Sequence, residues 1–255
     1  MKLLLSLLTT ILFFAIGWAC FAQGPAVTQA DYDLQNKNFA AACAEYQQLV
    51  NGQPNNVPLL LRFSQALEGK GDLDAAIAKA RQATQFEPNS VPAHMYLAHY
   101  LDANRDEQAA ALQYERILDI PKSPPAARKM VFGPLVRLYN KLGQRKKLLA
   151  IARQYVYEFP EDAASHYNLA WVMTQIESDK AKPSYNGAIK EYRKSLEANK
   201  DLAAARYNLA ALLRKEGRDS EAVHELEIFV STTSEDDPDM SSAMELLKKL
   251  KGEVH

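Results

Sequence analysis

Apolar and small residues recur along the chain at helical spacing, and this helical pattern itself repeats. In the stretch from residue 73 to 83 they stand at positions i, i+3, i+4, i+7 and i+10, as on the buried stripe of an amphipathic helix: Leu73, Ala76, Ile77, Ala80 and Ala83. Glycines and prolines interrupt similar stripes from about residue 26 to 234. The pattern predicts an all-α protein built from short helices.

The small residues share one period. Ala42, Ala76 and Ala110 are 34 residues apart, and Pro54 and Pro88 show the same step. A fixed period of this length indicates stacked helical hairpins, in which each hairpin covers the apolar face of its neighbour.

The period lengthens twice, which locates two insertions. Ala110 and Leu148 are 38 residues apart, so four residues are added, and we assign them to the connector 122–126. Ala170 and Ala210 are 40 apart, so six residues are added, and we assign them to the polar stretch 177–187.

The repeated residues resemble the tetratricopeptide repeat. The fifth hairpin carries the pattern most fully: Tyr167-Asn168-Leu169-Ala170, then Ala188, Tyr192 and Ser195. The sixth hairpin repeats it: Tyr207-Asn208-Leu209-Ala210, then Gly217, Ala222, Leu226 and Phe229. The glycines that follow the first helices, Gly71, Gly143 and Gly217, suit left-handed helix ends.

The resemblance implies a right-handed superhelical α-solenoid of about six helix-turn-helix hairpins plus a C-terminal capping helix. We expect an array over residues 23–236, with repeats at about 23–56, 57–90, 91–124, 125–162, 163–202 and 203–236. Residues 237–255 form the capping helix and tail, the helix running from about Asp239 to Leu250 with Met240, Met244 and Leu247 on one side.

Residues 1–22 have the pattern of an export signal. Lys2 precedes an apolar run that ends at Ala22, and small residues three before and one before Gln23 predict cleavage after Ala22. The run is also long enough for a retained membrane anchor, and lipid attachment at Cys20 is a third alternative, which Trp18 disfavours. Each alternative exports the body, to the periplasm or outside the cell, with or without a membrane anchor.

Composition and motifs argue against catalysis and nucleic-acid binding. The 30 lysines and arginines nearly balance the 31 aspartates and glutamates, so no polyanionic partner is indicated. Phosphate loops, nucleophile elbows and paired metal-binding histidines are absent from the sequence. Cys43 aligns with apolar residues one period on, which predicts a buried thiol. His94 and His166 occupy one equivalent place two repeats apart, too far to share a metal. We expect no enzyme activity, cofactor or metal.

The resemblance implies a concave groove, lined by the first helices, that binds a segment of another protein. By register the groove residues are Arg62, Gln65, Met95, His99, Arg137, Lys141, Tyr167, Asn168, Trp171, Tyr207, Asn208 and Arg214. A clamp for a C-terminal carboxylate would need lysines where Tyr167 and Tyr207 stand, so only its asparagines match.

Trp171 is the most specific of these residues, because the equivalent places hold Gln65, His99, Arg137 and Ala211. It either anchors an apolar side chain of the partner or packs against the six-residue insertion. We therefore expect a non-catalytic, exported scaffold. The alternatives are a structural subunit of a cell-envelope assembly bound through helix edges, and a small-ligand carrier.

Overall fold

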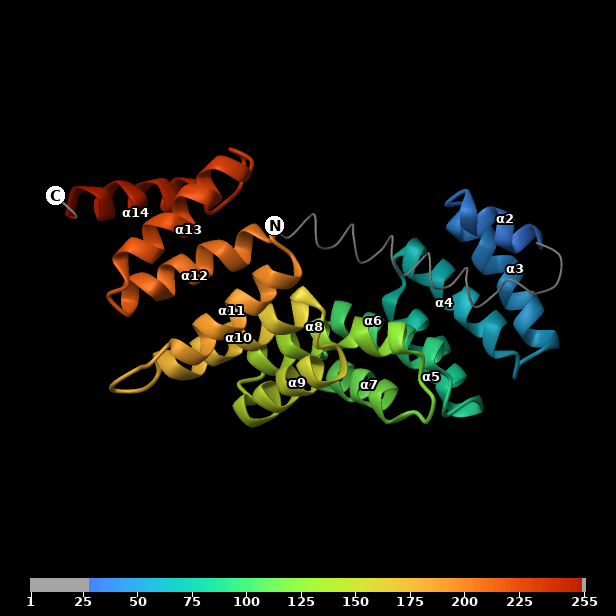
Figure 1. Ribbon diagram of the computed structural model, residues 1–255. Coiled ribbons are helices and arrows are strands. Elements are labelled where there is room, and N and C mark those ends of the chain that lie inside the picture. The colour runs from blue at the N-terminus through green and yellow to red at the C-terminus, as the bar shows by residue number, and fades with distance from the viewer. Residues whose placement is uncertain (1–27, 254–255) are drawn as a thin grey trace. The chain divides into compact units, whose positions relative to one another are not determined.

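The computed structural model describes residues 28–253, which form thirteen helices and no strand (Figure 1). The helices are α2 (Gln29–Gln35), α3 (Phe39–Gly52), α4 (Val57–Lys70), α5 (Leu73–Phe86), α6 (Val91–Ala103), α7 (Glu107–Asp119), α8 (Pro125–Lys141), α9 (Arg145–Glu158), α10 (Ala163–Ser178), α11 (Asn186–Ala198), α12 (Ala203–Lys215), α13 (Asp219–Thr232) and α14 (Met240–Glu253). The predicted all-α array is confirmed. The predicted export segment lies outside the described residues, and within them no helix is long and apolar enough to cross a membrane.

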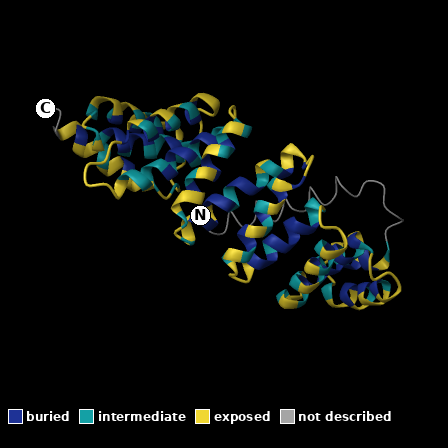
Figure 2. Cartoon of the chain, turned by 90° about the horizontal axis from the view of Figure 1, so that it is seen from below, coloured by how far each residue is buried: buried dark blue, intermediate teal, exposed yellow. Residues whose placement is uncertain are grey.

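The chain divides into two compact units, with the boundary between Leu138 and Tyr139 inside α8. In the first unit, helices α2 to α6 each pack on the next helix along the chain, and α6 packs on α7. In the second unit, the same order runs from α9 to α14. Buried residues lie on the sides of helices that face one another within a unit, and exposed residues lie on the outer sides (Figure 2).

Small residues are buried where the period places them. Ala42, Ala76, Ala110, Ala188 and Ala222 are each at most 1% exposed. Larger apolar and aromatic side chains fill the remaining space between helices, and in the second unit one continuous cluster extends from Ala170 to Leu250. Each helix pair thus buries its apolar stripe against its neighbours, as stacked hairpins require.

Local sequence sets where several helices begin. The side chains of Asn56, Asp72 and Asp106 each accept a hydrogen bond from a backbone N–H in the first turn of the following helix, at 3.1–3.2 Å. These bonds satisfy N–H groups that have no partner inside the helix.

The turns within the hairpins use the left-handed backbone region. Gly71, Gly143 and Gly217 have φ of 89°, 66° and 72°, as predicted. At the equivalent place in the first and third hairpins stand Lys37 and Arg105, with φ of 61° and 63°. The geometry of the hairpin therefore imposes this backbone conformation even where the residue is not glycine.

The first insertion differs in form from the prediction, and the second lies in the stretch 177–187 to which it was assigned. The four extra residues lengthen α8, which has 17 residues where α6 has 13, so they extend a helix rather than the connector. The six extra residues are shared between α10, which continues to Ser178, and the loop 179–185. Added residues form helix here because a longer helix keeps its backbone hydrogen-bonded.

The capping helix also differs in detail. It begins at Met240 and continues to Glu253. Met240, Ala243 and Leu250 are buried, whereas Met244 is 49% exposed. Met240 and Met244, predicted on one side of the helix, therefore have different environments, because the helix is rotated to direct Ala243 at the core.

Candidate functional site

The twelve residues predicted for partner binding all lie on the first helices of hairpins. Arg62 and Gln65 are on α4, Met95 and His99 are on α6, and Arg137 and Lys141 are on α8. The other six are on α10 (Tyr167, Asn168, Trp171) and α12 (Tyr207, Asn208, Arg214). The contacts that these residues make differ between the two units.

In the first unit, Asp31 of α2 connects two first helices. Its carboxylate forms an ion pair with Arg62 of α4 and accepts a hydrogen bond of 2.6 Å from the Tyr46 hydroxyl. Burial by itself would raise the pKa of the Asp31 carboxyl. The hydrogen bonds from Tyr46, Arg62 and Thr28 outweigh burial and hold that pKa below its usual value.

Similar polar contacts connect the later first helices of the first unit. Gln65 of α4 donates to the hydroxyl of Tyr96 on α6, and His99 Nε2 lies 2.9 Å from Glu68 Oε1. In the next step along the chain, Arg137 of α8 forms an ion pair with Asp102 of α6.

These contacts engage four of the predicted binding residues, namely Arg62, Gln65, His99 and Arg137. A fifth, Met95, is only 6% exposed. In the first unit the predicted face therefore serves to connect successive hairpins through polar side chains.

The second unit presents aromatic residues at the same places. The ring centroids of Tyr167 and Tyr192 lie 5.8 Å apart, and those of Tyr207 and Phe229 lie 5.7 Å apart. Asn208 Nδ2 donates to the Tyr167 hydroxyl at 3.4 Å, which joins α12 to α10. Burial raises the pKa of the Tyr167 hydroxyl, and the charge of Asp239 raises it further.

Three other predicted residues have a different environment. Asn168 Nδ2 donates to the carbonyl of Ala164, one turn earlier on its own helix, at 2.8 Å. Arg214 pairs with Asp219 at 3.2 Å, which joins α12 to α13. Lys141 is exposed at the end of α8.

Trp171 is partly exposed on α10. Within residues 28–253 its indole makes no hydrogen bond and no aromatic contact. Other residues anchor the nearby insertion: Tyr185 N–H donates to Glu216, Lys215 lies over the Tyr185 ring at 5.1 Å, and Ser184 N–H donates to Glu177 at 3.3 Å.

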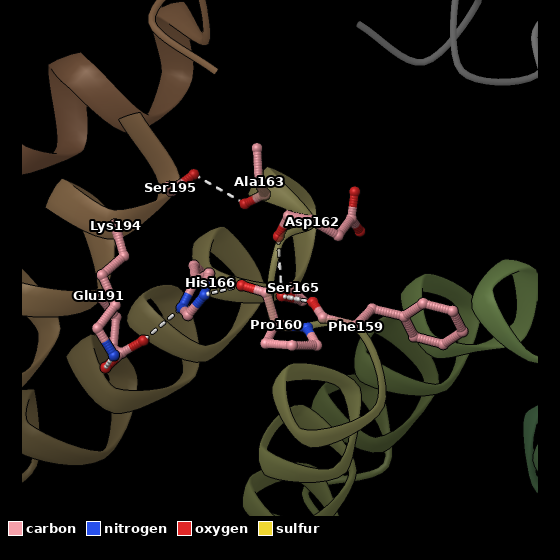
Figure 3. Close-up of polar contacts among 9 residues, drawn as sticks. All are labelled: Phe159, Pro160, Asp162, Ala163, Ser165, His166, Glu191, Lys194 and Ser195. Carbon is pink, nitrogen blue, oxygen red and sulfur yellow. Dashed lines mark hydrogen bonds and ion pairs between the residues drawn. The ribbon is translucent and has the colours of Figure 1, made fainter. Parts of the chain in front are cut away.

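The two aligned histidines join hairpins together, and Figure 3 shows the contacts of one of them, His166. His166 Nδ1 lies 2.6 Å from Glu191 Oε2, and Nε2 lies 2.8 Å from the carbonyl oxygen of Pro160. Ser195 Oγ, beside them, donates to the carbonyl of Ala163 at 2.8 Å. His166 thus links the end of the preceding hairpin to α11.

The equivalent residues of two other hairpins make equivalent contacts. His94 bonds Gln113 at 2.8 Å and the Pro88 carbonyl at 3.0 Å. Arg206 bonds Glu225 at 2.6 Å and the Lys200 carbonyl at 2.8 Å. His94 and His166 thus each contact the connector before their hairpin and the second helix of their own hairpin. Cys43 is buried as predicted, at 7% exposure, and burial raises the pKa of its thiol.

Comparisons with solved structures identify the fold. No family model matches the sequence, and no curated protein matches it. Among solved structures, YrrB, described as a TPR protein with an unusual peptide-binding site, has a TM-score of 0.60 at 15% identity over 80% of this chain and 97% of its own. A MamA crystal structure has a TM-score of 0.56 at 18% identity over 69% and 90%. This chain has the tetratricopeptide (TPR) fold. Cut9–Hcn1 of the APC/C matches with a TM-score of 0.53 at 14% identity, over 93% of this chain and 45% of the matched chain.

The TPR register shows what sequence reasoning missed. Asp31, Glu68 and Asp102 were not singled out, yet they bond Arg62, His99 and Arg137 on the next first helix. Each partner stands 31 or 35 residues later in the sequence. Acidic residues about one TPR period before basic ones were the signal that could have identified these bridges.

Proposed function

We propose that this protein is an exported, non-catalytic scaffold that holds a segment of another protein against the first helices α10 and α12. The observation that carries the proposal is Trp171, a partly exposed indole for which the described residues supply no hydrogen bond. Tryptophan dominates the energetics of many interfaces because it buries a large apolar area and still offers an N–H donor. The TPR register does not require an aromatic residue at this place.

The contrast between the two units supports this location. A partner that bound the first helices of the first unit would compete with the ion pairs of Arg62 and Arg137. On α10 and α12, a partner would meet the partly exposed rings of Tyr167, Trp171 and Tyr207 instead. Contact with these rings removes apolar surface from water without breaking an ion pair.

Site-specific photo-crosslinking tests the proposal in the full chain produced in its own cells. A photoreactive residue in place of Trp171 is expected to form crosslinks to one recurrent segment of a partner. The matched control carries the same residue in place of Tyr157, an 87% exposed aromatic residue on α9 of the same unit. Equal crosslinking from both positions, or none from position 171, would reject the assignment.

Tyr157 also supports a second candidate function. An aromatic side chain this exposed on a second helix suits a structural subunit that is bound through its helix edges. Crosslinks that arise from position 157 and not from position 171 would favour this alternative.

Export rests on residues 1–22 alone. The mass of the mature N-terminus distinguishes the three forms: cleavage after Ala22, a retained anchor, or a lipid on Cys20. An unprocessed chain recovered from the cytoplasm would contradict export.

A further inference from the structure

The charges of this chain are separated along the sequence, although their total is nearly balanced. Residues 120–157 contain nine lysines and arginines and no aspartate or glutamate. Residues 219–239 contain eight aspartates and glutamates and no lysine or arginine. The formal net charge of −1 therefore conceals two segments of opposite sign. Both segments reach the second unit, which contains α9 and the connector between α13 and α14.

The basic segment places two cations without partners on the outer side of α9. Four exposed residues of this helix are spaced i, i+4, i+7 and i+11, which puts them on one side: Lys146, Ala150, Arg153 and Tyr157. The buried residues of α9 lie on the opposite side of the helix. No carboxylate pairs with Lys146 or Arg153 among residues 28–253. This outer stripe of α9 is therefore positively charged and accessible.

The stability of α9 does not account for its cations. α5, α7 and α13 have acidic residues in their first turns, where the helix dipole favours negative charge. α9 instead begins with Arg145, Lys146 and Lys147, which the dipole disfavours. Arg145 pairs with Asp179, and Lys147 lies over the ring of Tyr139 at 5.2 Å. A carboxylate that approached Lys146 from outside would reduce the remaining repulsion.

The acidic segment ends in a connector whose carboxylates have no cation. The four acidic residues of α13 each pair with a cation of the second unit. Residues 233–239, which we call the acidic connector, add four more carboxylates: Glu235, Asp236, Asp237 and Asp239. None of these four pairs with a cation among the described residues, and Glu235 and Asp236 are exposed. The acidic connector is therefore a negatively charged counterpart to the outer stripe of α9.

Within one chain these two features belong to opposite ends of the packing order of the second unit. α9 packs on α10 at the start of that order, and the acidic connector joins α13 to α14 at its end (Figure 1). A contact between the outer stripe and the acidic connector therefore joins two copies of the chain.

We propose that the acidic connector of one copy docks on the outer stripe of α9 in a second copy, with its carboxylates paired to Lys146 and Arg153. A net charge near zero leaves little overall repulsion to oppose this association. Because the two docking surfaces differ, the contact is heterologous and can repeat, which produces a ring or a filament. The inference goes beyond the proposed function, which concerns α10 and α12.

Other anionic occupants fit the outer stripe less well. Recognition of an anionic lipid surface uses clusters of about four to eight lysines and arginines. Nucleic acids are held through many phosphate contacts. The outer stripe offers two cations without partners, which is enough for a short acidic segment, and the chain itself supplies one.

Charge reversal tests the inference in the full chain, purified as its own cells process it. Sedimentation is expected to show association at low salt and dissociation as the salt concentration rises. Lys146→Glu combined with Arg153→Glu should weaken association at least about tenfold, because like charges then face each other. Glu235→Lys combined with Asp236→Lys should do the same.

An equimolar mixture of the two double variants should restore association, because each surface then meets a surface of opposite charge on the other variant. The matched control is Lys182→Glu combined with Lys190→Glu, an equal charge change at exposed residues of the same unit, which should leave association unchanged. Trp171→Ala should also associate like the wild type.

Crosslinking identifies the surfaces in contact. A photoreactive residue in place of Ala150, between the two cations, should crosslink to residues 233–239 of another copy. Crosslinks to another copy of this chain bear on this inference, whereas crosslinks to a different protein bear on the proposed function.

Several outcomes would overturn the inference and leave the proposed function standing. They are a chain that stays monomeric at low salt, a mixture of the double variants that does not associate, and crosslinks from position 150 that avoid the acidic connector. Binding of anionic vesicles, of nucleic acid or of another protein through Lys146 and Arg153, without association between copies, would overturn it as well.

Discussion

Nδ1 of His166 lies 2.6 Å from Oε2 of Glu191, and Nε2 of the same ring lies 2.8 Å from the carbonyl oxygen of Pro160. A carbonyl oxygen accepts hydrogen bonds and cannot donate them, and the same is true of an ionised carboxylate. The Glu191 carboxylate also pairs with Lys194, at 3.1 Å. His166 therefore makes one of its two hydrogen bonds to a charged group, which is the stronger kind of hydrogen bond.

His94 makes the matching contacts with a neutral partner. Its ring meets the Pro88 carbonyl and the side-chain amide of Gln113. A hydrogen bond to an uncharged amide is weaker than one to a carboxylate. The two histidines therefore occupy one place in the repeat but contact partners of different charge.

We expect His166→Gln to lower the free energy of unfolding more than His94→Gln, by about 1.5–3 against about 0.5–1.5 kcal/mol. Urea unfolding of both variants measures this, and an equal loss of stability for both would contradict the stronger contact at His166.

Asp31→Asn should destabilise the first unit by about 1–3 kcal/mol, since it removes the ion pair between Asp31 and Arg62. The folded-state pKa of Asp31 is depressed, so its contribution is present at neutral pH and is lost as pH falls through that lowered pKa. The difference between wild type and variant should therefore vanish in strong acid. Hydrogen exchange of α2 and α4 reports the effect, and Asp119→Asn, exposed at the end of α7, is the control.

Arg105→Gly should stabilise the protein by about 0.5–1 kcal/mol. Arg105 has φ of 63°, where a side chain costs roughly 1–2 kcal/mol, and the added flexibility of glycine in the unfolded chain offsets part of the gain. Gly217→Ala, at φ of 72°, should destabilise for the same reason. Thermal unfolding measures both, and a lower melting temperature for Arg105→Gly would refute the assigned strain.

Ala110→Leu should cost about 1–3 kcal/mol, because Ala110 is fully buried and a larger side chain must push the helices of its hairpin apart. Leu112→Ala, two residues along the same helix and 50% exposed, should change stability by less than about 0.5 kcal/mol. Circular dichroism during denaturant unfolding distinguishes the two variants. A tolerated leucine at position 110 would argue against close helix packing there.

Much of the fold was predictable because its causes are local. The left-handed turns at Gly71, Gly143 and Gly217 were predictable because glycine adopts this backbone conformation without strain. The buried alanines depend on a 34-residue period that brings equivalent residues to equivalent places. Assignment of the twelve binding candidates to first helices depended on the same register. That they bind a partner stays a prediction.

By itself the sequence determined the helices, their pairing and the positions that require a small residue. These follow from helical spacing and from contacts between neighbouring hairpins. Only the tertiary structure decided which polar residues are already bonded. The environment of Arg62 depends on Asp31, 31 residues away, and on the reach of both side chains. The rotation that buries Ala243 and exposes Met244 likewise depends on how α14 packs against the second-unit core, which no local pattern encodes.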